Sequence, residues 1–299
     1  MKQEQFELTA ELELAHWWCI GRRKIMRAMV ERVVSPHEGR LVVDVGCCTG
    51  GTIQSLTDAY QCVGIDPSET ATKLGSTRFP AVKFICGFAP SDLKELAAQA
   101  DMFLMMDVLE HVPDDFQMLS EMFAAAKPGA HFLVTVPADM NLWSAHDESH
   151  HHYRRYEMVR FRRLWRDLPA TELMASYYNT RLFPLIRFIR QRNRRKGVSF
   201  GENSTDLRLP SPWANSVLSR IFGGESRRLQ KLLDHRKTEG YRAGVSLIAL
   251  LRREEGEVEP FSRPTDVAAD PFDPHTQSWR SGERLEGVAS VAGDANVSN

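Results

Sequence analysis

Short apolar segments alternate with helix-like stretches between residues 40 and 136, and this alternation limits the fold more than any other feature of the sequence. The apolar runs are 41–45 (LVVDV), 61–65 (QCVGI), 82–86 (VKFIC), 102–106 (MFLMM) and 131–136 (HFLVTV). Continuous apolar strands are typical of a parallel sheet that is covered on both faces. The stretches between them, such as 52–60 and 116–126, have the length of crossover helices. We therefore expect a doubly wound α/β fold.

The segments on either side of this unit have different compositions. Residues 1–38 show a helical pattern, which we interpret as an N-terminal helical lid. Residues 39–253 are expected to form the α/β domain, with a helical cap inserted at about 139–225 and a last strand at 244–253. Residues 254–299 are rich in Glu, Asp, Ser, Gly and Pro and contain one leucine, a composition that predicts a disordered tail.

The charge balance and the cysteine content argue against several classes of protein. Lys and Arg number 38 against 39 Asp and Glu, so no overall field attracts nucleic acid. The five cysteines lack CxxC spacing, which favours reduced thiols over a disulfide framework. No apolar run reaches the ~18 residues that a membrane-spanning helix needs, and the N-terminus lacks a signal-peptide pattern. We expect a cytoplasmic protein that has no nucleic-acid partner.

A glycine-rich turn follows the first predicted strand. Residues 44–51 read DVGCCTGG, and such a turn between a strand and a helix exposes backbone N–H groups to a ligand. About 20 residues further along the chain, the next strand ends in Asp66. Doubly wound folds place a carboxylate at that position to accept both hydroxyls of a bound ribose. The two signals together predict a cofactor that contains a ribose.

The spacing within the turn separates two kinds of cofactor. A nicotinamide dinucleotide calls for GxGxxG, whereas Gly46, Gly50 and Gly51 follow an acid two residues before the first glycine. This arrangement resembles the DxGxGxG loop of class I S-adenosylmethionine-dependent methyltransferases. The resemblance extends over residues 16–156 and includes ADMFLMMDVLEHVPDD at 101–116. It implies a Rossmann-like fold with a mostly parallel seven-stranded sheet, and S-adenosylmethionine as the cofactor.

The resemblance also implies cofactor contacts, residue by residue. Asp44 and Gly46 would border the methionine part, Asp66 would hold the ribose, Ala89 would lie beside the adenine and Asp107 would close the pocket. Further contacts are implied for Trp17, Arg22, Cys47, Gly50 and Pro67.

Cys48 departs from the family loop, because it stands at the position of the middle glycine. Its side chain would occupy space through which backbone normally approaches the cofactor. This predicts weaker binding or a shifted loop. We interpret the thiol as inert rather than reactive, since it lies beside apolar strands.

The segment after the fifth predicted strand carries the candidates for the acceptor side, because segments that leave strand ends line the ligand crevice of an open α/β sheet. It resembles a bacterial subgroup that pairs an HWW…GRR start with LWSxHD…RRY, here residues 142–147 and 154–156. We predict His146 as general base, oriented by Asp147, with His152 as a further catalytic candidate. Acceptor contacts are predicted for Trp143, Arg154 and Tyr156.

Other interpretations of this segment stay open. It could be a solvated polar loop with capping side chains. A metal site among His146, Asp147 and residues 150–152 is disfavoured, because adjacent histidines do not easily converge on one ion and no second cluster is evident. We therefore expect no bound metal.

Two aromatic and basic segments also have two interpretations each. Trp17 and Trp18 with Arg22 and Arg23 could form a flap over the cofactor, or a helix that docks its aromatic face on the sheet. Residues 181–197 form an amphipathic basic helix. Its function could be contact with an anionic membrane surface or with a lipid-linked acceptor, but we favour a cap helix with a solvated basic face.

The sequence thus predicts a small-molecule methyltransferase. An oxygen acceptor is favoured because a His–Asp base pair is available. One alternative is a non-catalytic cofactor-binding sensor or partner subunit, and another is a nicotinamide-linked oxidoreductase.

Overall fold

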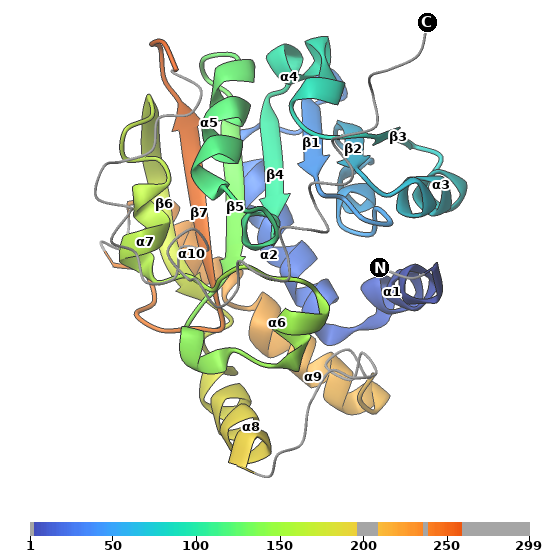
Figure 1. Ribbon diagram of the computed structural model, residues 1–299, viewed down its shortest axis with the longest axis vertical. Coiled ribbons are helices and arrows are strands. Elements are labelled where there is room, and N and C mark those ends of the chain that lie inside the picture. Colours follow the sequence, from blue (N-terminus) through green and yellow to red (C-terminus); the bar gives the residue numbers. More distant parts are fainter. Residues whose placement is uncertain (1–2, 196–208, 236–238, 259–299) are drawn as a thin grey trace, which may run out of the picture.

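The computed structural model describes residues 3–195, 209–235 and 239–258, and its centre is a seven-stranded sheet of order β3-β2-β1-β4-β5-β7-β6 (Figure 1). The strands are β1 (Leu41–Val45), β2 (Gln61–Asp66), β3 (Val82–Cys86), β4 (Met102–Met106), β5 (His131–Pro137), β6 (Ala170–Tyr178) and β7 (Ser246–Arg253). Strand β7 pairs antiparallel with β5 and β6, and the other pairs are parallel. The predicted doubly wound, mostly parallel fold is confirmed.

Helices cover both faces of the sheet. The helices are α1 (Gln3–Ala15), α2 (Trp17–Val33), α3 (Glu69–Arg78), α4 (Glu95–Gln99), α5 (Asp115–Ala125), α6 (Ala145–Ser149), α7 (Met158–Arg163), α8 (Phe183–Arg195), α9 (Pro212–Gly223) and α10 (Ser226–Leu233). Four 3-10 turns are η1 (Ile53–Leu56), η2 (Ser91–Leu93), η3 (Leu109–His111) and η4 (Met140–Leu142). One core cluster joins the sheet to α4, α5 and α7, and a second joins it to α2, α9 and α10.

Two predicted elements differ from the structure. Residues 52–60 were expected to form a crossover helix, but they contain only η1. Strand β6 did not appear among the apolar runs, because its sequence ATELMASYY mixes polar with apolar residues and only part of it is buried. It lies at the edge of the sheet, where one-sided burial removes the continuous apolar pattern.

The predictions for the two chain ends were an N-terminal helical lid and a disordered C-terminal tail. The helical pattern of residues 1–38 corresponds to two helices rather than one, because His16 caps α2 by accepting a hydrogen bond from the Trp18 backbone. Residues 259–299, most of the predicted tail, lie outside the described residues. None of the helices in the described ranges combines the length and apolar character needed to cross a bilayer.

The parallel strands direct several loops to one edge of the sheet. The loops after β1, β2, β4 and β5 leave from the carboxyl ends of neighbouring strands. In Figure 1, α6, α8 and α9 lie beyond this edge. A ligand crevice is expected there in an open α/β sheet.

Candidate active site

A cavity of about 1760 Å³ opens at the carboxyl edge of the sheet. Its walls come from the ends of β1, β2, β4 and β5, from the start of α2, from the α6 region and from α8. A smaller cavity of about 130 Å³ shares Trp18, Arg22 and Cys48 with it. The shared residues place the two cavities side by side, and we call the smaller one the narrow end of the site.

The turn after β1 is held beside the end of β2. The backbone N–H groups of Gly46 and Cys47 donate to the Ile65 carbonyl at 2.8 and 3.1 Å. Asp66 accepts from the Cys48 backbone through Oδ2 and from the Ser68 backbone through Oδ1, both at 2.9 Å. Burial raises the pKa of the Asp66 carboxyl. Each oxygen can accept a second hydrogen bond from the cavity, which Asp66 lines.

Cys48 takes the left-handed conformation that favours glycine, with φ of 50°. The turn therefore keeps its course with a side chain at this position, and that side chain lines both cavities. Burial raises the pKa of the Cys48 thiol to about 12, so the sulfur is protonated at neutral pH. A protonated thiol is a poor nucleophile.

The narrow end of the site combines an acid and a base. Asp44 lines the smaller cavity and is 2% exposed, and its Oδ2 has no hydrogen-bond partner among the described residues. Burial raises the pKa of Asp44 to about 7. The Arg22 guanidinium lies over the Trp18 ring and donates to Asp107 Oδ2 at 2.6 Å. Helix α2 therefore contributes Trp17, Trp18 and Arg22 directly to the cavity wall.

The other residues predicted for the cofactor fall into two groups. Pro67, Ala89 and Asp107 line the large cavity. Cys47 lines only the smaller one. Gly50 lines neither, since a Cβ there would collide with the Phe84 ring, and its role is to allow close packing.

Asp147 is fully buried and forms a capping box with Ser144 at the start of α6. It accepts hydrogen bonds from the Ser144 backbone (2.9 Å), His152 Nδ1 (2.9 Å) and Arg155 Nε (2.8 Å). Burial opposes ionisation, but Arg155 and His152 outweigh it and hold the pKa of Asp147 below its usual range. The predicted pairing of Asp147 with His146 is therefore wrong, because Asp147 orients His152.

His146 does line the cavity, with its ring centroid 4.0 Å from that of His150. Burial and the neighbouring His150 lower the pKa of His146 well below its ordinary value. It is a neutral imidazole in a cluster with His150 and His152. The alternative of a solvated loop does not describe this segment, since Asp147, His152 and Arg155 are buried.

Two predicted acceptor contacts are structural residues instead. Arg154 is 2% exposed and donates to the carbonyls of Leu109, Val112 and Pro113. Tyr156 is fully buried and its hydroxyl donates to an Asp115 carboxylate oxygen at 2.7 Å. Neither lines the cavity. They brace the loop after β4, while Trp143 lines the cavity and donates to Glu148.

Several residues of the cavity wall were not predicted from the sequence, among them Arg155, Glu110 and His111. Arg155 lies between Arg154 and Tyr156 in the sequence, and it lines the cavity. Glu110 and His111 follow β4 in η3 and also line the cavity. Burial raises the pKa of Glu110 well above its ordinary value, and the surrounding protein desolvates His111 and lowers its pKa to about 3. Glu110 and His111 lie in the turn that follows the buried strand β4, and this position is the signal that could have identified them.

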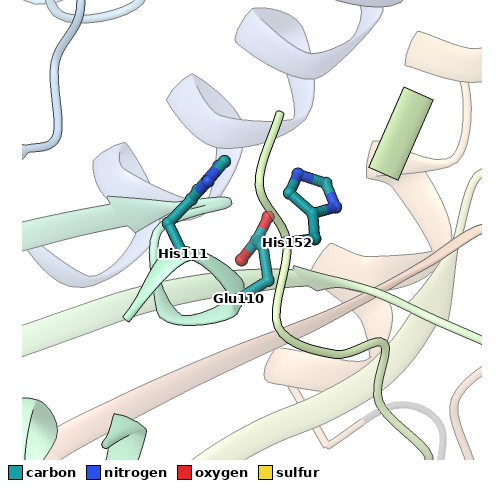
Figure 2. Close-up of side chains that lie close together, drawn as sticks. All are labelled: Glu110, His111 and His152. Carbon is teal, nitrogen blue, oxygen red and sulfur yellow. The ribbon is translucent and has the colours of Figure 1, made fainter. Parts of the chain in front are cut away.

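In the folded protein, the histidine segment, for which we expected no metal, lies beside further potential metal ligands. The backbone N–H of Tyr153 donates to the Glu110 carbonyl at 2.7 Å and holds the two segments together. Ligand atoms of Glu110, His111 and His152 all lie within 4.8 Å of one another. Figure 2 shows the Glu110 carboxylate between the two imidazole rings.

Residues 43–134 match the methyltransferase domain family. This segment therefore resembles a methyltransferase domain. The ubiquinone biosynthesis O-methyltransferase of Ralstonia nicotianae is 32% identical over 149 residues, which are 44% of this chain and 60% of that protein. The trans-aconitate 2-methyltransferase of Variovorax paradoxus is 29% identical over 123 residues, 39% of this chain and 45% of that protein. The chain spans less than half the length of three of the curated relatives that it matches.

The fold of the methyltransferase domain also occurs in solved structures. The plantazolicin methyltransferase BpumL, in complex with a pentazolic desmethylPZN analog and SAH, superposes with a TM-score of 0.51 at 13% identity. The superposition covers 84% of this chain and 91% of that one. The Rossmann-like methyltransferase fold therefore extends well beyond the segment matched by the family.

The segment that matches the family contains only part of the cavity wall. The matched segment of the methyltransferase domain contains Asp44, Asp66, Asp107, Glu110 and His111. Helix α2 and the segment from Trp143 to Arg155 lie outside it.

Proposed function

We propose that this protein is an S-adenosylmethionine-dependent methyltransferase that acts on a small molecule. The observation that carries the proposal is one continuous cavity with Asp66 and Asp107 at the strand ends on one side and a histidine cluster on the other. Such a cavity can hold a methyl donor and an acceptor in contact. Methyl transfer depends mainly on alignment of the two reactants, because the sulfonium is already a good leaving group.

The residues present fit the cofactor. Asp66 offers two oxygens for the ribose hydroxyls, and Phe88 and Ala89 supply an apolar wall for the adenine. At the narrow end, the buried Asp44 Oδ2 and Arg22 Nε have no hydrogen-bond partner among the described residues. A methionine ammonium and carboxylate would supply the opposite charges that these two groups call for.

The acceptor would occupy the part of the cavity lined by Trp143, His146, His150 and His152. We favour an oxygen acceptor, because a cluster of imidazoles lies at that end. Since Asp147 orients His152, we assign activation of the acceptor hydroxyl to His152 rather than to His146. In the transfer the acceptor hydroxyl loses its proton to water, an O–CH3 bond forms, the S–CH3 bond breaks and its electron pair stays on sulfur.

Helix α8 supports an acceptor with an apolar part. Ile186 and Ile189 line the cavity, and Leu185 and Phe188 are exposed on the same helix. The exposed Arg187 and Arg192 accompany them and would favour an anionic surface. We therefore include a lipid-linked acceptor, reached from a membrane surface, in the proposed substrate class.

The test uses purified protein, methyl-labelled S-adenosylmethionine and an extract of its own host, with label followed into aqueous, organic and macromolecular fractions. We expect label in the organic fraction. Label in the aqueous fraction alone would keep the activity and remove the lipid-linked acceptor. Binding of S-adenosylhomocysteine without transfer to any extract would favour a non-catalytic cofactor-binding protein. Competition by NADH would instead favour an oxidoreductase.

A further inference from the structure

Glu110 is a buried carboxyl group that faces the cavity. It is 1% exposed, and neither carboxylate oxygen has a hydrogen-bond partner among the described residues. The acids Asp107 and Asp147 repel its charge, and Arg155 attracts it. Burial of an unpaired carboxylate is costly, so such groups in folded proteins are paired or coordinate a metal ion. Glu110 lines the cavity, where a cation could reach it.

Two imidazoles stand beside this carboxylate. His111 follows Glu110 in η3, and His152 arrives from the loop after α6. Their ring centroids are 4.6 Å apart and their planes meet at 83°. The three side chains each bring one ligand atom into a space of 4.8 Å, and the view in Figure 2 shows them converging. A small ion at the centre would lie within coordination distance of all three after slight contraction.

Asp147 prepares His152 for such a role. An ionised carboxylate only accepts hydrogen bonds, so the 2.9 Å contact puts the ring proton on His152 Nδ1. The lone pair of the neutral ring is then on Nε2. Asp147 is itself held by Arg155 and by the Ser144 backbone. A histidine that binds a metal ion commonly donates its other ring N–H to a carboxylate, which fixes the orientation of the ring.

We propose that Glu110, His111 and His152 bind a divalent transition-metal ion that coordinates the acceptor in the cavity. Two imidazoles and one carboxylate suit Zn²⁺, Fe²⁺, Mn²⁺ or Co²⁺ better than Mg²⁺, which prefers oxygen ligands. All three side chains line the cavity, so the remaining coordination positions face the space assigned to the acceptor. This inference rests on the proposed function, and in it His152 holds the ion that activates the acceptor and does not itself take the proton.

The chemistry points to an acceptor with a hydroxyl group, and favours one with two neighbouring oxygen atoms that occupy two open positions. A hydroxyl bound to a divalent ion loses its proton to water more readily, because the ion stabilises the negative oxygen. That oxygen attacks the methyl carbon of S-adenosylmethionine. The new bond is O–CH3, the broken bond is S–CH3, and S-adenosylhomocysteine leaves with the electron pair on sulfur.

The test measures metal binding directly, on the full chain without a histidine tag. Protein stripped with EDTA is titrated with Co²⁺ and followed by visible absorption and calorimetry. We expect one tight equivalent whose spectrum lacks a thiolate band. Glu110→Gln and His152→Ala should each weaken binding by more than about 100-fold, and Asp147→Asn by about 10- to 100-fold. The controls His151→Ala and Glu148→Gln, exposed neighbours outside the cluster, should bind as the wild type.

Binding of S-adenosylhomocysteine is measured on the metal-free protein. This measurement distinguishes failure of the metal site from failure of the proposed function. Cofactor binding without any Co²⁺ binding would overturn the metal site and leave the methyltransferase proposal in place. Co²⁺ binding that survives both Glu110→Gln and His111→Ala would also overturn it. Co²⁺ binding that these variants lose, in a protein that never binds S-adenosylhomocysteine, would support the metal site and contradict the proposed function. Loss of methyl transfer after EDTA and its return with Zn²⁺ or Mn²⁺ would support both.

Discussion

The side of the cavity that we propose for the cofactor and the side that we propose for the acceptor differ in where their residues come from. On the cofactor side, Gly46, Asp66 and Asp107 directly follow or end parallel strands, and all three line the cavity. On the acceptor side, the predicted Arg154 and Tyr156 are buried braces, whereas the unpredicted Arg155 and Glu110 line the wall. Strand ends meet at one edge of a parallel sheet by topology, but the orientation of loop residues depends on which groups they pack against.

The largest expected effect concerns Asp66 on the cofactor side. Asp66→Ala should weaken S-adenosylhomocysteine binding by about 4 kcal/mol, on the order of 10³-fold, because two hydrogen bonds to a charged group are lost. Calorimetry on the purified variant measures it. Asp58→Ala, an exposed carboxylate away from the cavity, is the control. Unchanged affinity in the Asp66 variant would remove the ribose from this position.

A substitution of Arg154 tests whether this residue stabilises the fold, as the structure indicates, or contacts the acceptor. Arg154→Met should lower the free energy of unfolding by about 3 kcal/mol, because three carbonyls and Asp115 lose a buried cation. Arg162→Met, which removes an exposed ion pair with Glu172, should cost less than about 1 kcal/mol. Denaturant unfolding compares the two. An unchanged stability with a raised KM for the acceptor would return Arg154 to the substrate site.

His152 and its neighbours test which imidazole acts on the acceptor. His152→Ala should lower kcat by about 10²-fold and leave cofactor affinity nearly unchanged. His151→Ala, at an exposed neighbouring position, should retain the wild-type rate. A full loss in His146→Ala together with wild-type turnover in His152→Ala would reverse our assignment and restore His146 as the residue that acts on the acceptor.

The smallest expected effect is a pH dependence at the narrow end of the site. Burial raises the pKa of Asp44 to about 7, so this carboxyl is mostly protonated below that pH. The methionine ammonium stays charged over this range and favours the ionised form. Cofactor affinity should therefore rise about tenfold between roughly pH 5.5 and 7, with a proton released on binding. Asp44→Asn should flatten the profile, and a profile unchanged by that variant would assign the pH dependence to another group.

The sequence predicted the interior of the sheet better than its edge. Runs such as LVVDV and MFLMM are buried on both faces, so their apolar character is continuous and visible. Strand β6 has an edge position and a mixed composition, and the crossover at 52–60 contains only a single 3-10 turn. Neither could be inferred from apolar periodicity, because neither depends on a fully buried face.

The sequence by itself determined the fold class, the glycine-rich turn and the acid at the end of β2, because these follow from strand order and from local backbone requirements. Only the tertiary structure decided that Asp147 faces His152 rather than His146, and that Arg155 rather than Arg154 lines the cavity. It also brought Glu110 and His111 beside a histidine about 40 residues away in sequence. The physical reason is that a buried charge takes the partner that packing supplies, and packing joins segments that the linear sequence keeps apart.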